Sequence, residues 1–111
     1  MQGITGAEKI KALMVKFREE SPKEFAGIAV ECVEDFSISK RTLQDGTIEE
    51  IDLPIADVLK YKLVDNSWIA VRPSGTEPKI KFYIGAFDDS GVEIERKVVL
   101  LEESINSFVN E

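Results

Sequence analysis

The residues best able to do chemistry form one short segment of the chain, Arg72-Pro73-Ser74-Gly75-Thr76-Glu77-Pro78-Lys79. It lies between two apolar runs that could be joined by a turn of far fewer residues. The segment offers a guanidinium, two hydroxyls and the amides of a glycine-containing turn, and nearly all of these groups donate hydrogen bonds. Such a set suits a tetrahedral oxyanion such as phosphate, because arginine binds it through two nitrogens and turn amides form a concave anion site.

The charge of this segment differs from that of the rest of the chain. The 111 residues include 14 Lys and Arg, 21 Asp and Glu and no His, for a net charge of −7. Residues 72–81 carry +2, so the other residues carry −9. A cationic site on an acidic protein concentrates small anions, whereas nucleic acids and anionic membranes require broad positive surfaces. We therefore expect a small anionic partner, with no nucleic acid and no membrane.

The same residues also have a purely structural interpretation. Prolines and Gly75 are ordinary turn residues, and Arg72 could simply pair with Glu77 or with another carboxylate. The spacing of Ser74 and Glu77 matches a helix capping box, but Pro78 makes a continuing helix unfavourable. Composition alone leaves the anion site and the plain turn as equal alternatives.

Other candidate residues have simpler explanations. Adjacent carboxylates on a helix do not converge on one ion, so three such pairs are interpreted as solvated charge: Asp88-Asp89, Glu49-Glu50 and Glu102-Glu103. Cys32 lies in an apolar run without a histidine to activate it, and is expected to be a small buried side chain. Trp68 and Phe82 lie in strand patterns and are expected to pack in the core or against another domain. No metal site is predicted.

Two amphipathic helices are expected to position these residues. The first begins with a capping box of Thr5 and Glu8 and ends before Pro22, and the second begins with a box of Ser90 and Glu93. Their apolar stripes follow helical spacing: Ile10, Leu13, Met14 and Phe17, and then Ile94, Val98, Leu101, Ile105 and Phe108.

The remaining apolar runs predict strands, at residues 25–33, 61–64, 68–71 and 79–87. Residues 65–67 suit a tight turn between two of them. Asp45-Gly46 favours a hairpin between 38–43 and 47–51, with a long ordered loop as the alternative. Residues 55–59 are expected to form one helical turn.

These elements predict a single α+β domain over residues 1–111. One-sided helices and half-apolar strands become buried when two helices pack on one face of an antiparallel sheet of about four strands. No apolar run approaches the ~20 residues of a membrane span, and the N-terminus lacks the pattern of a secretory signal. With a single cysteine, the chain is expected to be cytoplasmic.

The eight-residue loop and the Lys-Ile-Lys-Phe-Tyr run that overlaps its end closely resemble the phosphate-binding loop of the C-terminal (fourth) domain of α-D-phosphohexomutases. The resemblance covers essentially the whole chain, and three further segments carry it: Gly6-Ala7-Glu8-Lys9-Ile10, Val33-Glu34-Asp35-Phe36 and Asp65-Asn66-Ser67-Trp68. It is strongest to bacterial phosphoglucomutases of the phosphomannomutase-like branch. A phosphomannomutase or a phosphoglucosamine mutase is the alternative within the family.

The resemblance implies a fold related to the TATA-binding protein, in an enzyme of four domains that interconverts hexose 1-phosphates and 6-phosphates. A serine of the first domain transfers the phosphoryl group, aspartates of the second hold Mg²⁺, and the third recognises the sugar. The fourth closes over the cleft and binds the phosphate that is not being transferred. It implies phosphate-binding roles for Arg72, Ser74, Gly75 and Thr76, loop-shaping roles for Pro73, Glu77 and Pro78, and secondary roles for Lys79 and Lys81.

The chain contains no nucleophilic serine loop and no cluster of aspartates. It is therefore interpreted as a fragment of a longer enzyme, with residues 1–4 near the domain boundary. The fragment alone should be inactive and without a cofactor, and its expected partners are a phosphorylated hexose and the missing N-terminal domains. A free-standing anion-binding or regulatory module and a purely structural domain are the competing interpretations.

Overall fold

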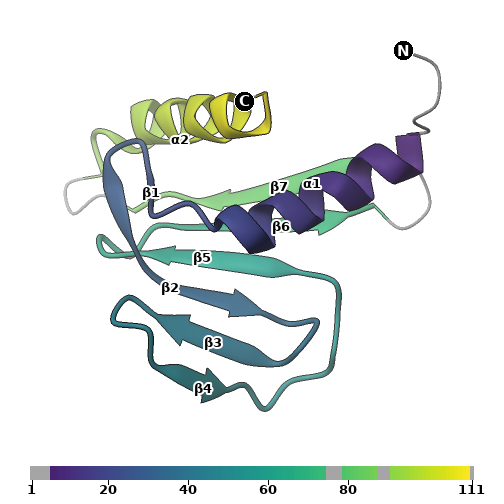
Figure 1. The fold of residues 1–111 in the computed structure, drawn as a ribbon. Helices are drawn as coiled ribbons and strands as arrows, with labels where there is room; N and C mark the ends of the chain where they lie inside the picture. The colour runs from purple at the N-terminus through teal and green to yellow at the C-terminus, as the bar shows by residue number, and fades with distance from the viewer. Residues whose placement is uncertain (1–5, 75–78, 88–90, 111) are drawn as a thin grey trace.

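The computed structural model describes residues 6–74, 79–87 and 91–110. It is an α+β domain, as predicted, in which strands β2 to β7 form one antiparallel sheet in the order β4-β3-β2-β5-β6-β7 and β1 pairs with β2 (Figure 1). The elements are α1 (Gly6–Glu20), β1 (Glu24–Phe25), β2 (Ile28–Asp35), β3 (Lys40–Leu43), β4 (Ile48–Glu50), β5 (Leu59–Leu63), β6 (Trp68–Pro73), β7 (Ile80–Gly85) and α2 (Ile94–Val109).

Both helices lie on the same face of the sheet, over β5, β6 and β7 (Figure 1). Their apolar stripes and the inward side chains of the strands form one core, which includes Met14, Phe17, Leu59, Tyr61, Leu63, Ile69, Val71, Leu101 and Ile105. The Tyr61 hydroxyl inside this core donates a 2.9 Å hydrogen bond to the carbonyl of Phe17. Desolvation raises the pKa of Tyr61, so the phenol stays protonated and keeps donating.

The opposite side of β5, β6 and β7 is covered by neither helix. We call it the helix-free face, and by strand alternation it consists of Lys60, Lys62, Trp68, Ala70, Arg72, Lys81, Tyr83 and Gly85. On β2 a register shift between Val30 and Cys32 turns Val30 toward the core and Cys32 toward this opposite side. Cys32 is buried there, as predicted, and burial raises the pKa of its thiol.

The sheet has more strands than the four predicted. The additional ones are β1 and the pair β3–β4, which realises the hairpin expected around Asp45-Gly46. Gly46 has a φ of +92°, and the Asp45 carboxylate accepts a 2.9 Å hydrogen bond from the amide of Thr47. The hairpin signal was therefore correct because it depended on local turn chemistry.

Two local predictions were wrong. Residues 55–58 do not form a helical turn, because Ala56 N–H donates to the Phe36 carbonyl and the Val58 carbonyl accepts from Phe36 N–H, at 3.1 and 3.0 Å. The second helix begins at Ile94, and its N-cap residue Glu93 makes no side-chain capping bond. The predicted capping box required a helical backbone directly after Ser90. Gly91 instead has a φ of +74°, which is outside the range of a right-handed helix. Ser90, like Thr5 of the first box, lies outside the described residues.

Candidate functional site

The predicted phosphate-binding segment lies at the end of the β6–β7 hairpin. The two strands pair in register, with Arg72 opposite Lys81 and Pro73 opposite Ile80. Ser74 N–H then donates a 2.9 Å hydrogen bond to the Lys79 carbonyl, which continues the pairing by one step. The base of the loop is thus an ordered extension of the sheet. Gly75, Thr76, Glu77 and Pro78, which connect Ser74 to Lys79 in the sequence, lie outside the described residues.

Arg72 and Lys81 bring two positive charges together at this base. Both are exposed side chains of the helix-free face, and they occupy directly opposed positions on neighbouring strands. Like charges in such positions destabilise a sheet. Among the residues that the structure describes, no carboxylate forms an ion pair with either of them. An anion placed between the two side chains would relieve their repulsion.

Ser74 and Lys79 extend this arrangement toward the tip of the loop. Alternation assigns them to the same side of the hairpin as Arg72 and Lys81. Ser74 is half-buried and its amide is engaged by Lys79, whereas the side chain of Lys79 is exposed. The structure therefore brings together four of the predicted residues, including both lysines that had been given secondary roles. Pro73 lies with them on β6, paired with Ile80.

The rest of the helix-free face carries charged and aromatic residues that the sequence interpretation had not assigned to a site. The ammonium of Lys60 lies 4.8 Å from the ring centroid of Trp68, within range of a cation–π contact. Trp68 covers Gly85, where a Cβ atom would lie 2.1 Å from the indole Nε1. Trp68 is thus on the surface side of the sheet, whereas Phe82 packs against the core, as expected. Alternation along β5 and β6 was the signal that could have revealed this face.

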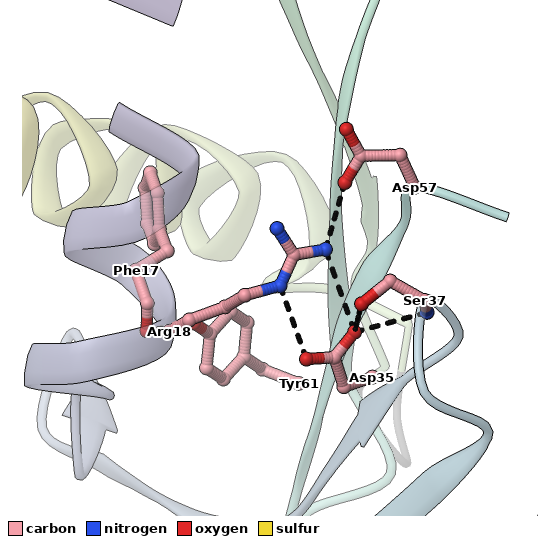
Figure 2. A network of polar contacts seen from close by, with 6 residues as sticks. All are labelled: Phe17, Arg18, Asp35, Ser37, Asp57 and Tyr61. Atoms are coloured by element: carbon pink, nitrogen blue, oxygen red, sulfur yellow. Dashed lines mark hydrogen bonds and ion pairs between the residues drawn. The ribbon is translucent and has the colours of Figure 1, made fainter. Parts of the chain in front are cut away.

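A cluster around Arg18 fixes the strand next to the site (Figure 2). Arg18 Nε donates to Asp35 Oδ2 at 3.0 Å, and Arg18 Nη2 donates to Asp57 Oδ1 at 2.7 Å. Asp35 Oδ1 also accepts from the amide and the hydroxyl of Ser37, at 3.0 and 2.6 Å. The cluster therefore joins the end of α1 to the end of β2 and to the segment that leads into β5.

The Arg18 cluster is connected to the loop through strands β5 and β6. Asp57 lies two residues before Leu59, which pairs with Val71, the neighbour of Arg72. Partial burial of Arg18 disfavours the charged guanidinium and so lowers its pKa. The hydrogen bonds to Asp57 and Asp35 outweigh this effect, and the pKa of Arg18 is raised. The guanidinium is therefore bound by two carboxylates through its Nε and Nη2 atoms. Sequence reasoning missed the cluster because its members lie 17 and 39 residues apart and share no local pattern.

A second ionic contact anchors the opposite end of the β6–β7 hairpin. Lys97 of α2 lies 2.7 Å from Asp65 Oδ2, and Asp65 Oδ1 accepts a 2.9 Å bond from the amide of Ser67. The Ser67 hydroxyl in turn accepts from Phe87 N–H at 2.9 Å. Burial opposes ionisation of Asp65, but Lys97 and Ser67 outweigh it and lower the pKa of the carboxyl. The end of the hairpin that lies away from the loop is thus held by a contact with α2.

A cavity of about 410 Å³ lies between the end of α1 and strands β2 and β3, away from the loop. Its wall includes Phe17, Val33, Leu59 and Arg18, and the last is already bound by Asp35 and Asp57. With Arg18 occupied and Asp35 itself in the wall, this cavity suits an anion less well than the exposed pair at the loop.

No set of three or more potential metal ligands gathers anywhere in residues 6–74, 79–87 and 91–110. Within the same part of the chain, neither α1 nor α2 has the length and apolar character needed to cross a bilayer. The cationic and hydroxyl groups at the base of the loop are of the kind that can bind an anion.

Comparison with known proteins gives a consistent result. Residues 8–100 match the family model for the phosphoglucomutase/phosphomannomutase C-terminal domain. The chain is 42% identical over 98 residues to a phosphoglucomutase of Staphylococcus epidermidis strain ATCC 12228, covering 87% of this chain and 18% of that protein. It is 39% identical over 103 residues to a phosphoglucomutase of Staphylococcus aureus strain NCTC 8325, covering 88% and 18%. No solved structure gives a significant match. The chain thus spans about a fifth of the length of these curated relatives.

Proposed function

The chain belongs to the phosphoglucomutase/phosphomannomutase C-terminal domain family, and we propose that it is the substrate-phosphate-binding domain of a phosphoglucomutase. The observation that carries the proposal is the exposed pair of Arg72 and Lys81, opposed across the base of the loop with no described carboxylate to neutralise them. Such a pair offers a phosphate two charged donors from a rigid sheet. Ser74 and Lys79 on the same hairpin, with Gly75 and Thr76 between them in the sequence, complete the proposed set.

In this proposal the domain contributes binding energy and does no bond-making. Holding one phosphate of a hexose phosphate fixes the direction in which the sugar points, so that its other end can meet the reacting group. A charged clamp binds the phosphate group whichever hydroxyl carries it. It therefore serves both the 1-phosphate and the 6-phosphate of the same sugar.

The catalytic serine and Mg²⁺ of the proposed enzyme would lie in other parts of a longer chain. The described residues provide no ligand set for a metal ion, and they do not fit Mg²⁺. Contacts with the preceding domains would close the site around the sugar, and closure would couple to capture of the phosphate. The sugar itself would be chosen mainly elsewhere in the chain, so a phosphomannomutase or a phosphoglucosamine mutase is compatible with the same domain.

Titration of the 111-residue chain with glucose 6-phosphate, followed by amide chemical shifts, tests the proposal. Shifts should concentrate in residues 72–81, and binding should be weak, because one domain supplies only part of a pocket. Arg72→Gln should weaken binding by about tenfold or more, since a charge-assisted hydrogen bond contributes roughly 1.5–3 kcal/mol. Arg96→Gln, which removes the same charge from an exposed position on α2, is the matched control and should bind normally.

Two results would count against the proposal. One is equal weakening by the Arg72 and Arg96 variants, which would mean that only net charge matters. The other is a set of shifts that avoids residues 72–81 altogether. In the full-length gene product, Arg72→Ala should mainly raise KM and also slow turnover. A gene that ends with this chain and has no upstream region would favour the free-standing anion-binding module instead.

A further inference from the structure

Four consecutive apolar residues, Leu53-Pro54-Ile55-Ala56, are all exposed in the segment between β4 and β5. Leu53 and Ile55 are 57% and 75% exposed. Single exposed apolar residues are common on proteins, but a run of this length is expected only where something covers it. Elsewhere in the part of the chain that the structure describes, exposed apolar residues follow one another at most in pairs, as at Val99 and Leu100.

The backbone of this run is held by the neighbouring connection between β2 and β3. Ala56 N–H donates to the Phe36 carbonyl at 3.1 Å, and Ile51 N–H donates to the Ser39 carbonyl at 2.9 Å. Between the two acceptors lies Ile38, which is 60% exposed. We call this surface, Ile38 together with the exposed run, the apolar end patch. It is preformed, so binding of a partner does not have to order a loop.

The apolar end patch lies at the same end of the sheet as the predicted phosphate-binding residues (Figure 1). The register aligns Asp35 of β2 with Leu59 of β5, and Leu59 with Val71, the residue before Arg72. Strands β5, β2 and β3, which begin or end beside the patch, lie one to three strands from β6, or about 5–15 Å at the usual strand spacing. A partner that contacts the patch is therefore also close to the phosphate site.

Acidic residues surround the apolar end patch. Asp52 and Asp57 flank the run on either side, and Glu50 ends the preceding strand. The carboxylates of Asp57, which is bound by Arg18, and of Glu50 remain exposed. An apolar centre with an acidic rim is complementary to a protein surface that has apolar residues at its centre and Lys or Arg at its edge. The same rim repels an anionic ligand.

We propose that the apolar end patch docks onto another part of a longer enzyme, at a surface with apolar residues ringed by Lys and Arg. The proposal rests on one element of the proposed function, namely that the chain is a domain of a phosphoglucomutase. The chain spans 18% of each curated relative, so more than four-fifths of such an enzyme lies outside it. A phosphate at Arg72 belongs to a sugar whose other end must reach a group in that remainder. The end of the sheet that carries both the patch and Arg72 therefore faces it, and docking at the patch positions Arg72 relative to the reacting group.

Hydroxyl-radical footprinting of the full-length protein, read by mass spectrometry, tests the docking directly. Val64, in the turn between β5 and β6, and Val92, before α2, are 54% and 79% exposed and are internal references for Leu53 and Ile55. With saturating glucose 6-phosphate, Leu53 and Ile55 should be oxidised about fivefold or more slowly than the two valines, because the core of an interface is buried. Equal rates in the ligand-bound protein would overturn the proposal.

Two matched double variants of the full-length protein show whether the docking contributes to substrate binding. Leu53→Ser with Ile55→Ser should raise the KM for glucose 6-phosphate by about tenfold, because two apolar side chains no longer become buried on docking. Val64→Ser with Val92→Ser removes two apolar side chains of similar exposure and should change KM by less than about twofold. Since all four side chains are exposed, both variants should keep the far-UV circular dichroism spectrum of the parent protein.

The outcomes separate the docking surface from the proposed function. If Arg72→Gln raises KM while Leu53→Ser with Ile55→Ser does not, the docking surface is excluded and the proposed function stands. If Leu53 and Ile55 are protected but Arg72→Gln has the kinetics of the parent, the phosphate-binding role fails and the docking surface stands. Protection that disappears on dilution of the protein would assign the patch to a second copy of the chain and overturn the proposal.

Discussion

Two arginines on the same side of the sheet have opposite surroundings. Arg41 of β3 donates to Glu34 Oε2 from Nε and Nη2, at 3.0 and 2.7 Å, and to Glu49 Oε1 from Nη1 at 3.1 Å. These bonds, to Glu34 first and then Glu49, raise the pKa of Arg41. Arg72 of β6 instead faces Lys81 and has no described acidic partner. One guanidinium completes a structural ion cluster, and the other adds to a local excess of positive charge.

The difference extends to the strands that carry the two arginines. On β2, β3 and β4, each outward charge close to Arg41 is matched by an opposite one, and Glu34 is almost fully buried. On β6 and β7, the outward cations Arg72 and Lys81 form no ion pair with a described carboxylate, whereas Lys60 of β5 lies opposite Glu34 of β2. Around Arg41 the charges are paired within the sheet, whereas Arg72 and Lys81 at the base of the loop are placed to bind an anion from outside it. We infer that Arg41 serves stability and Arg72 serves binding.

Removal of Arg18 should give the largest loss of stability. Arg18→Ala leaves Asp35, whose side chain is only 17% exposed, without its partner and frees the segment around Asp57. The free energy of unfolding should fall by about 2–3 kcal/mol, as expected for a broken, partly buried ionic cluster. Urea denaturation measures the change. Arg96→Ala should alter stability by less than about 0.5 kcal/mol, and an equal loss in both variants would contradict a structural role for the cluster.

Arg41→Gln should have a smaller effect of the same kind. It leaves Glu34, which is 6% exposed, without a cationic partner, and we expect a loss of about 1–2 kcal/mol. The companion variant Glu49→Gln removes only the exposed contact and should cost about 0.5 kcal/mol or less. If the two variants are equally destabilised, the buried contact with Glu34 does not dominate.

The contact between Asp65 and Lys97 should appear as a pH dependence of stability. The pKa of Asp65 in the folded chain is below its ordinary value of 3.8. The contribution of Asp65 to the free energy of unfolding is therefore fully present when the pH is above that ordinary value. It is lost as the pH falls through the lowered pKa of the folded chain. Denaturation between pH 2 and pH 6, compared with Asp65→Asn, checks this: the variant should lose less stability on acidification. Parallel curves for the two proteins would exclude the contribution.

Arg72→Gln should have the smallest effect on stability. Its side chain is exposed and faces a like charge, so the free energy of unfolding should stay within about 0.5 kcal/mol of the parent chain or rise slightly. The same urea denaturation experiment measures it. A loss comparable to that of Arg41→Gln would show that Arg72 has a structural partner and would remove the contrast between the two halves.

Part of the fold and of the site could be predicted from the sequence. These are the parts that depend on residues close to each other along the chain. Alternation of Ile80, Phe82 and Ile84 with Lys81 and Tyr83 predicted which side of β7 is buried. The loop was recognised because its residues are contiguous. Two-residue periodicity and contiguous motifs both depend on near neighbours in the chain, so a single sequence displays them.

The features that sequence reasoning missed depend on distant partners. The non-helical path of residues 55–58 is set by hydrogen bonds to Phe36, some twenty residues earlier, which override a local helical tendency. Likewise, only the pairing of β5 with β6 brings Lys60 beside Trp68. Arg41 and Arg72 look alike in sequence, since each is an arginine near carboxylates, and only the register of the strands separates them.

Glucose 6-phosphate affinity, measured side by side for Arg72→Gln and Arg41→Gln at a pH and temperature where both are folded, tests the central claim most directly. The two variants lose the same charge from the same side of the sheet. The account predicts that Arg72→Gln weakens binding by about tenfold or more, while Arg41→Gln stays within about twofold of the parent chain. Equal weakening, or the reverse order, would contradict the assignment of Arg72 to binding and of Arg41 to structure.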